Sequence, residues 1–448
     1  MVFSSISFLY YFLPVVLLIY YAVPAALRNY VLLLASLIFY AYGEGKYLFL
    51  MISEIMAAYV FSIFIEKHRN DKKGKILCAL SIMFSLSFLL FFKYAGFFAE
   101  TFSDVTGISM GSLRIALPAG ISFYTFQIIS YTVDIYRGNS RTGRFSDFAA
   151  YVSMFPQLIA GPIVRYRDIE KELRKRSLSS ESVSEGIRRF AIGLGKKVLI
   201  ANQLAELVNI ADNINEPTLS MHIFSILCYG LFVYFDFSGY SDMAIGIGRI
   251  LGFHFMENFN YPFIAGSITE FWQRWHISLG SWFRDYVYIP LGGNRKGIKR
   301  QLVNISAVWM LTGLWHGAGW NFVLWGIYFA VILFIEKCGL LKTLKKHRIF
   351  SHIYVITVVA VSFAIFKGDM DYSFVSVINE ETLYYIKSYM VVFLVAVTGA
   401  TKAIKNFTEK IPERNRNVLE VIFILVLLIL STAYLVDGSF NPFLYFRF

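Results

Sequence analysis

The chain has 448 residues, of which 57% are hydrophobic and 16% charged, and its formal net charge is +12. Soluble domains carry about 25% charged residues, so this composition excludes an ordinary soluble or disordered protein. Apolar runs near the ~20 residues that a helix needs to cross a bilayer recur throughout. The chain is therefore predicted to be an all-α polytopic membrane protein. In such a protein the excess of Lys and Arg indicates cytoplasmic loops and not a nucleic-acid surface.

The predicted membrane segments follow one another along residues 1–448, which we interpret as one integral-membrane domain. Between them, residues 148–164 form a short piece with Pro156, Gly161 and Pro162, which predicts a re-entrant segment. The candidate spans are about 6–26, 28–43, 47–65, 76–98, 116–136, 198–211, 221–251, 350–366, 386–401 and 418–436.

A further apolar stretch, 301–335, is too long for one crossing. It is interrupted by Gly313, Gly317 and Gly319 around His316. This pattern predicts a helical hairpin or a broken helix with His316 near its bend. Irregular backbone at membrane depth is tolerated only where it is buried in protein or lines a cavity.

The loops alternate in charge, which predicts an orientation. Because cytoplasmic loops carry the excess of Lys and Arg, the basic loops are placed in the cytoplasm and both termini outside. The basic loops are 66–75, 137–144, 165–176, 295–300, 337–348 and 402–416, and the neutral or acidic loops are 100–104, 212–216 and 369–381. Residues 187–211 interrupt this pattern with Lys196 and Lys197, and the first half of this segment is expected to lie along the membrane surface.

The candidate catalytic region, about 254–335, contains all seven tryptophans, between Trp272 and Trp325. Its first part, 254–300, mixes apolar, aromatic and charged residues. Short amphipathic or re-entrant helices are expected there, carrying His276 into a cavity. No metal site is predicted, since the three cysteines lie in or beside apolar runs without metal-ligand spacing.

Two Trp-His pairs, Trp275-His276 and Trp315-His316, mark the chemistry-bearing part of this region. A neutral imidazole can accept a proton near neutral pH, which suits a general base acting on a hydroxyl. Intramembrane ionisable residues are functional candidates because their burial is costly. For His316, between glycines, the functional interpretation is favoured over a packed core histidine. For His276 the two interpretations are balanced.

Other ionisable residues have weaker interpretations. Asp236 and Asp242 lie in an apolar aromatic segment, where a structural pairing is favoured. Arg284-Asp285 fits an internal salt bridge as well as a donor-binding pair. The loop 292–296 fits either phosphate binding or a cytoplasmic anchor. Three isolated residues in apolar stretches receive no role: Glu54, Lys93 and Glu206.

Several strings resemble the membrane-bound O-acyltransferase superfamily, in particular its bacterial branch with alginate O-acetyltransferase and the teichoic-acid D-alanyl transferase. The resemblance covers nearly the whole chain. The ending Pro290-Leu291-Gly292-Gly293-Asn294-Arg295 is more similar to the alginate type. The other matching strings are Met1-Val2-Phe3-Ser4-Ser5, Pro156-Gln157-Leu158-Ile159-Ala160-Gly161-Pro162-Ile163, Phe235-Asp236-Phe237-Ser238-Gly239-Tyr240-Ser241-Asp242 and Trp275-His276-Ile277-Ser278-Leu279.

The resemblance implies a ring of about 11 transmembrane helices, with re-entrant and amphipathic helices, around a central tunnel. It implies that His316 is the catalytic histidine and His276 a second functional one. The expected reaction moves an acyl group, acetyl foremost, from a cytoplasmic thioester donor to an extracytoplasmic glycan hydroxyl. The expected substrate-binding or tunnel-lining residues are Trp275, Arg284, Asp285, Trp315, Trp320, Asn321 and Asp236.

The resemblance also implies the partners. The donor is acetyl-CoA or an acylated carrier protein, used as a substrate with no permanently bound cofactor. The acceptor is an envelope polysaccharide or an extracytoplasmic esterase-like acetyltransferase that acylates it. Three alternatives stay open: D-alanyl transfer to teichoic acid, a transporter of an envelope glycan, and a structural subunit of a secretion complex.

Overall fold

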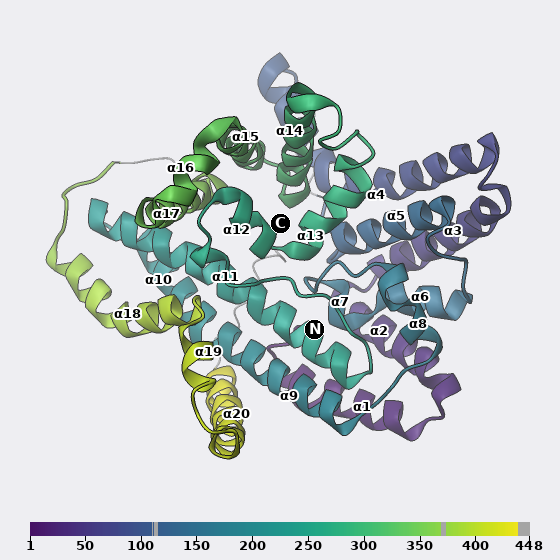
Figure 1. The fold of residues 1–448 in the computed structure, drawn as a ribbon, viewed down its shortest axis with the longest axis horizontal. Coiled ribbons are helices and arrows are strands. Elements are labelled where there is room, and N and C mark those ends of the chain that lie inside the picture. Colours follow the sequence, from purple (N-terminus) through teal and green to yellow (C-terminus); the bar gives the residue numbers. More distant parts are fainter. Residues whose placement is uncertain (110, 112–114, 369–372, 438–448) are drawn as a thin grey trace.

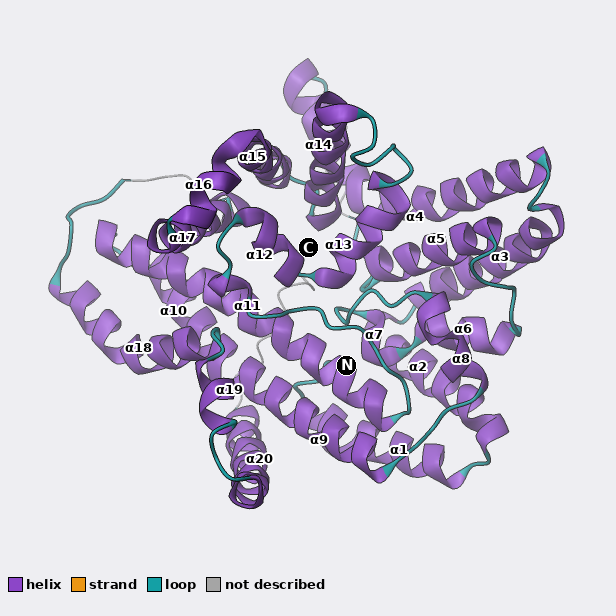
Figure 2. Cartoon of the chain, viewed as in Figure 1, coloured by secondary structure: helices purple, strands orange, loops and turns teal. Residues whose placement is uncertain are grey.

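The protein is all-α in the computed structural model, which describes residues 1–448 except 110, 112–114, 369–372 and 438–448. Within these described ranges every named element is a helix, and β-pairing is limited to an isolated bridge between Thr218 and Ser376. Figure 2 shows helices joined by loops throughout. The predicted fold class is therefore confirmed.

The helices of the N-terminal half are, in chain order, η1 (Ser7–Phe12), α1 (Leu13–Ala22), η2 (Ala25–Leu27), α2 (Arg28–Glu44), α3 (Tyr47–His68), α4 (Lys72–Thr106), α5 (Ile121–Arg137), α6 (Phe145–Ser153), α7 (Phe155–Leu158), α8 (Tyr166–Arg174), α9 (Ser180–Gly195), η3 (Lys196–Ala201) and α10 (Asn202–Asp212). The second half contains α11 (Leu219–Ile250), η4 (Pro262–Ile264), α12 (Ile268–Arg274), α13 (Ile277–Phe283), η5 (Arg284–Tyr288), α14 (Gly297–His316), α15 (Trp320–Ile335), η6 (Glu336–Leu340), α16 (Leu341–Lys346), α17 (Arg348–Lys367), α18 (Glu380–Gly399), α19 (Ala403–Thr408) and α20 (Glu413–Val436).

Eight helices of the described chain are long and apolar enough to cross a membrane. They are the helices of 25–44, 47–68, 72–106, 219–250, 320–346, 348–367, 380–399 and 413–436. The expected count of about 11 is not confirmed, because three predicted spans fold as shorter helices. The segment 116–136 becomes helical only from Ile121, after Pro118 and Gly120, and 198–211 contributes the 11-residue α10. The first span is limited to Ser7–Ala22.

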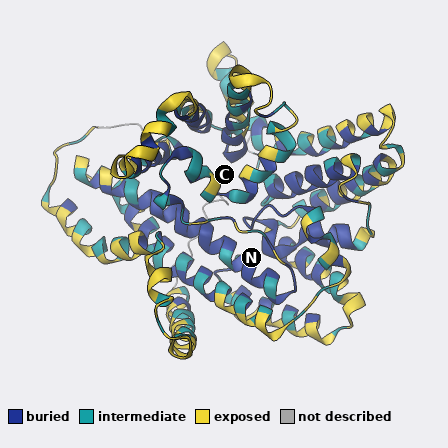
Figure 3. Ribbon diagram, in the orientation of Figure 1, coloured by how far each residue is buried: buried dark blue, intermediate teal, exposed yellow. Residues whose placement is uncertain are grey.

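Helix α11 runs through the middle of the molecule and is buried along most of its length (Figures 1 and 3). Helix α9 lies against it, and glycines make this approach possible. A Cβ on Gly193 would lie 2.5 Å from the carbonyl oxygen of Gly239, and one on Gly186 would lie 2.7 Å from that of Gly246. Small residues at such contacts let membrane helices pack backbone to backbone. At the periphery, α18 and α20 expose most of their apolar residues, as expected of lipid-facing helices.

The segments predicted to be short fold as short helices, and their position relative to the membrane stays a prediction. Residues 148–164 fold as the end of α6 and the four-residue α7, neither of which can span a membrane. Residues 254–300 form η4, α12, α13 and η5, of three to seven residues each. These short helices lie between α11 and α14, near the centre of the molecule (Figure 1).

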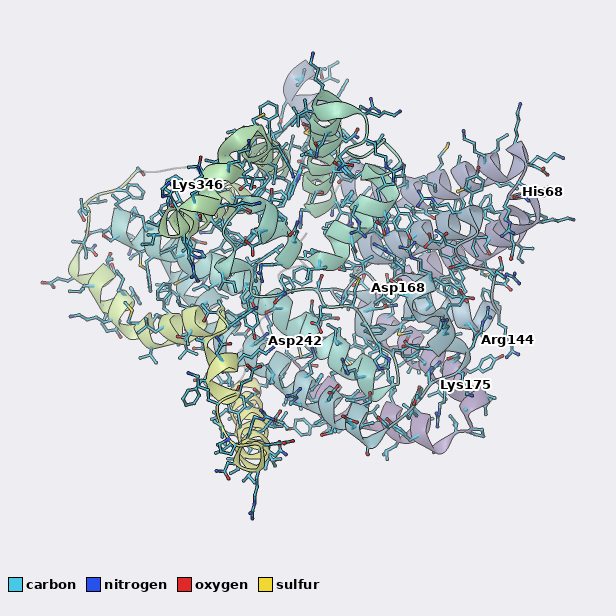
Figure 4. All side chains as sticks on the ribbon, viewed as in Figure 1. His68, Arg144, Asp168, Lys175, Asp242 and Lys346 are labelled. Atoms are coloured by element: carbon cyan, nitrogen blue, oxygen red, sulfur yellow. The ribbon has the colours of Figure 1, made fainter. Side chains whose placement is uncertain are left out.

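Loops predicted on one side of the membrane contact one another. The Thr142 amide donates to Glu66, and the Arg137 guanidinium donates to the Asp285 carbonyl at 3.1 Å. His68, Arg144 and Lys175 lie along one edge of the view in Figure 4. Among the neutral and acidic loops, which are predicted on the other side, the Leu219 amide at the end of one loop donates to the Ser376 carbonyl of another. The charge alternation thus agrees with the loop contacts, while the side on which each set lies stays a prediction.

Candidate active site

The predicted break in the stretch 301–335 is present, and His316 stands at it. His316 is the last residue of α14, Gly317 is extended, and α15 begins at Trp320. The glycines let the two helices meet closely. A Cβ on Gly313 would lie 2.3 Å from the carbonyl oxygen of Phe322, and one on Gly317 would overlap the Phe322 ring. The glycines therefore accommodate α15, and the histidine is held at a tight turn between the two helices.

His316 is 6% exposed and surrounded by aromatic rings. The ring centres of Trp315 and Trp325 each lie 5.1 Å from that of the imidazole, and that of Phe366 lies 5.3 Å away. On its open side His316 lines a cavity of about 70 Å³. The other polar and aromatic groups of this cavity include Glu44, Lys93, Ser122, Phe123 and Trp315. A buried imidazole that faces a small polar cavity is suited to meeting a hydroxyl group there.

His276 is held in an unusual backbone conformation by the loop 258–260. Its φ of 46° lies in the left-handed region, which among the described non-glycine residues is otherwise adopted by Tyr261. Such conformations cost roughly 1–3 kcal/mol and persist where the surroundings enforce them, often at functional sites. Here the Ile277 amide donates to the Asn258 carbonyl at 3.0 Å, which pins the chain directly after the histidine.

The Asn258 side chain fixes the tautomer of His276. Its Oδ1 lies 3.1 Å from Nδ1 of His276 and accepts from the amide and hydroxyl of Ser278, while its Nδ2 donates to Ser241. Because this oxygen can only accept, Nδ1 of His276 carries the proton. The neutral ring then presents the lone pair of Nε2, which is buried and has no hydrogen-bond partner among the described residues.

Trp315 brings the two histidines together. Its ring centre lies 5.1 Å from that of His316 and 5.9 Å from that of His276. The same indole packs against Phe123 and Phe126 of α5. Two histidines 40 positions apart in the sequence thus flank one indole, with His316 facing the cavity and His276 on the side of α11, where Phe237 contacts it.

The other aromatic candidates lie farther from the cavity. Trp275 is buried in a cluster with Phe271 and Phe259, where it packs in the hydrophobic core. Trp320 is 60% exposed and contacts Phe97, so the structure does not bring it to His316. The rings that pack on the His316 imidazole are instead those of Trp315, Trp325 and Phe366. Asn321 donates to the Phe366 carbonyl and ties α15 to the end of α17.

Arg284 and Asp285 form the internal salt bridge, at 2.8 Å, and Asp285 has further partners. Its Oδ2 pairs with Arg165 at 2.7 Å and Arg167 at 3.0 Å. Burial raises the pKa of Asp285, but the guanidiniums of Arg284, Arg165 and Arg167 more than offset this, so its pKa is lower than usual. Asp285 therefore joins η5 to the start of α8 as an ionised centre, and Arg167 also pairs with Asp168, which is labelled in Figure 4.

Asp236 and Asp242 have the structural pairing that the sequence favoured. Asp236 forms a fully buried ion pair with Lys197 at 2.6 Å. Asp242, labelled in Figure 4, pairs with Lys196 at 2.7 Å and Arg189 at 2.9 Å. The lysines that interrupt the apolar run 187–211 are thus the partners of the two aspartates on α11, and they hold η3 against it.

Comparison with known proteins identifies the class. The profile of the membrane-bound O-acyltransferase family matches residues 121–341, which contain both histidines and the break at Gly317. With the relatives described next, this match shows that the chain belongs to the membrane-bound O-acyltransferase family. It is therefore a multi-pass membrane acyltransferase.

The relatives have related activities in their names. The chain is 41% identical to the probable alginate O-acetylase AlgI of Azotobacter vinelandii, over 82% of this chain and 75% of that protein. It is 34% identical to the peptidoglycan O-acetyltransferase of Helicobacter pylori, over 78% and 72% of the two chains. The teichoic acid D-alanyltransferase of Bacillus subtilis is 30% identical over 49% of this chain and 59% of its own.

Four residues of the site were missed from the sequence: Asn258, Trp325, Phe366 and Lys93. Trp325 belongs to the tryptophan cluster between Trp272 and Trp325, and that membership was a usable signal. Asn258 and Phe366 lie in ordinary surroundings, and no local pattern distinguishes them. Lys93 stands out in the sequence as an isolated charge in an apolar run. Its partner, the Trp315 carbonyl, is identified only by the fold.

Proposed function

We propose that this protein transfers an acyl group, acetyl foremost, from a cytoplasmic thioester donor to an extracytoplasmic cell-envelope polysaccharide or to a partner protein that acylates it. The observation that carries the proposal is that His316, which lines a cavity, and His276 flank the same indole, that of Trp315. The names of the relatives, which act on alginate and peptidoglycan, support an envelope polymer as the final acceptor.

The cavity at His316 fits an acceptor that arrives from outside. Under the predicted orientation, the ends of α2 and α4 and the residues before α5 lie towards the outer face. Glu44 and Pro118 come from the end of α2 and from the residues before α5, and they line the cavity with Lys93 and His316. The donor thioester would come from the opposite side, where the basic loops gather. Acetyl-CoA and an acylated carrier protein both present a thioester with a phosphate-bearing arm, which suits a positively charged face.

The reaction requires one proton transfer to the protein. The acceptor hydroxyl oxygen attacks the thioester carbonyl carbon while His316 takes the hydroxyl proton. The tetrahedral intermediate then collapses with cleavage of the C–S bond, and the departing thiolate receives the proton, which regenerates the neutral imidazole. A positioned base contributes about 10²–10⁴-fold to such a step. The rings of Trp315, Trp325 and Phe366 exclude water, which limits hydrolysis of the thioester.

His276 has a supporting role in this scheme. Asn258 sets its tautomer so that the Nε2 lone pair is available as an acceptor. From its place behind Trp315 it would position donor or acceptor, or help move the proton. D-alanyl transfer from a carrier protein is the second candidate, and the 30% identity to a teichoic acid D-alanyltransferase over 49% of the chain supports it. The alginate-type and peptidoglycan relatives share far more of the chain and favour acetyl.

The test is acylation of the envelope in a deletion strain that expresses variants. His316→Ala should lose about 10²–10⁴-fold of the acylation normalised to membrane protein level, with an unchanged denaturation midpoint in detergent. His254→Ala is the matched control, because that histidine is exposed and pairs with Glu172 away from the cavity. With purified protein, release of free thiol from acetyl-CoA and from an acylated carrier protein distinguishes the two donors.

Wild-type acylation by a folded His316→Ala protein would contradict the role given to this residue. If His316 were only a packed core residue, the opposite result is expected. The alanine variant would then lose stability and expression and keep its specific activity. Loss of D-alanyl groups rather than acetyl groups in the deletion strain would replace the acetyl assignment by the second candidate.

A further inference from the structure

Helix α14 ends at His316 without a backbone cap of the usual kind. The last four carbonyl groups of an α-helix have no partner within the helix and need one elsewhere, particularly away from water. Many helices solve this with a left-handed residue directly after the helix. Here Gly317 is extended, with a φ of −171°. The carbonyls before His316 must therefore find donors from another part of the chain.

Two consecutive residues of α4 supply these donors. The ammonium of Lys93 donates to the Trp315 carbonyl, and the hydroxyl of Tyr94 donates to the Leu314 carbonyl. A cation at a helix C-terminus is also favourable because of the negative end of the helix dipole. The last turn of α14 is thus capped from a helix more than 200 positions away in the sequence.

Lys93 connects this cap to the reaction site. It lines the same cavity as His316, and its ammonium lies 5.9 Å from the centre of the Trp315 ring, over its face. One side chain therefore contacts the backbone carbonyl next to His316 and the indole that separates the two histidines. A displacement of Lys93 would move both the imidazole and the cavity wall.

We propose that Lys93 is a positioning residue for acyl transfer: with Tyr94 it clamps the last turn of α14 and sets the orientation of His316 towards the cavity. The inference rests on the proposed role of His316 as the base. Lys93 acts through the backbone of α14 and through Trp315, and it does not take part in bond making. Its loss should therefore lower kcat more than it raises KM for the donor.

The experiment compares Lys93→Met, Lys93→Arg and Tyr94→Phe in purified protein, with Lys75→Met as the control. Lys75 is an exposed lysine at the other end of α4. Because a misplacement of about 1 Å can cost about 10²-fold, Lys93→Met should lower kcat by about 10–100-fold. Lys93→Arg keeps charge and donors and should retain at least about tenfold more activity than Lys93→Met. Tyr94→Phe should fall between them, and Lys75→Met should equal the wild type.

A second measurement, hydrogen exchange of the peptide 310–320, does not depend on activity. Lys93→Met should accelerate this exchange and Lys75→Met should not, at equal denaturation midpoints. Wild-type kcat and exchange in Lys93→Met would overturn the inference, as would equal losses in Lys93→Met and Lys93→Arg. A wild-type protein without acyl transfer would contradict the proposed function alone, and the exchange would still decide whether the clamp exists.

Discussion

Replacing Asn258 by leucine tests whether His276 depends on the buried side chain that holds it. The asparagine is 1% exposed, and its Oδ1 serves three donors: Nδ1 of His276, the Ser278 amide and the Ser278 hydroxyl. Leucine has a similar size and accepts no hydrogen bond. Nδ1 of His276 can then donate to the Ser278 hydroxyl oxygen, 3.5 Å away, which leaves the Ser278 amide and hydroxyl hydrogens as two orphaned donors. At about 1–3 kcal/mol for each unsatisfied buried donor, the expected destabilisation is roughly 2–6 kcal/mol.

The effect on catalysis is separable from this loss of stability. Without the acceptor at Nδ1, the His276 ring is free to rotate and to exchange tautomers, so Nε2 is no longer presented in one direction. A misplaced group of this kind costs about 10–100-fold. Asn258→Asp keeps an oxygen acceptor for all three donors and should retain more activity than Asn258→Leu. The assay is acyl transfer per folded protein, with the folded fraction measured by thermal denaturation in detergent.

Equal activity in wild type and Asn258→Leu would refute the assignment of the tautomer and of any role for Nε2 in transfer. Equal losses in the leucine and aspartate variants would show that the hydrogen bonds of Oδ1 are not what His276 requires.

Three further predictions address orientation, charge pairing and pH. The background variant has the exposed Cys338 replaced by serine. In it, a cysteine introduced at Asp104 should be labelled in intact cells and one at Lys405 should not. The reverse pattern would contradict the predicted orientation. Lys197→Met should destabilise the protein by about 3–5 kcal/mol because it leaves Asp236 as an uncompensated buried charge, whereas the double variant with Asp236→Leu should recover most of the midpoint. The lowered pKa of Asp285 means that its ion pairs stabilise the protein fully above the ordinary carboxyl pKa, near 4, and that this stability is lost as the pH falls through the lowered value. The denaturation midpoint of the wild type should therefore drop more steeply between about pH 5 and pH 3 than that of Asp285→Asn, and parallel curves would contradict it.

The sequence by itself determined the class of fold and the place of the chemistry. Hydrophobic run length predicted membrane helices because a bilayer imposes a minimum length. The glycines around His316 predicted the break between α14 and α15, since helix interruption is a local property of the backbone. The Trp-His strings carried the resemblance to the acyltransferase family, which the comparisons confirmed.

Partners distant in the sequence were decided only by the tertiary structure. Lys196 and Lys197 interrupt an otherwise apolar run, and the sequence does not show their partners. The packing of η3 along α11 places Lys196 at Asp242 and Lys197 at Asp236. The predicted number of spans is not confirmed, because the segments around α5 and α10 fold as helices of 17 and 11 residues.

The same distinction applies to the site. Trp320 and Trp325 both lie near His316 in the sequence, and only the angle between α14 and α15 decides that Trp325 faces the imidazole while Trp320 faces outward. Asn258 contacts His276 from a loop 18 positions away, and Lys93 of α4 contacts the Trp315 carbonyl, next to His316, from more than 200 positions away. Hydrophobic periodicity and glycine breaks are encoded locally and can be read in order along the chain. The orientation of a side chain towards a distant partner depends on how whole helices pack, and a single sequence does not specify that packing residue by residue.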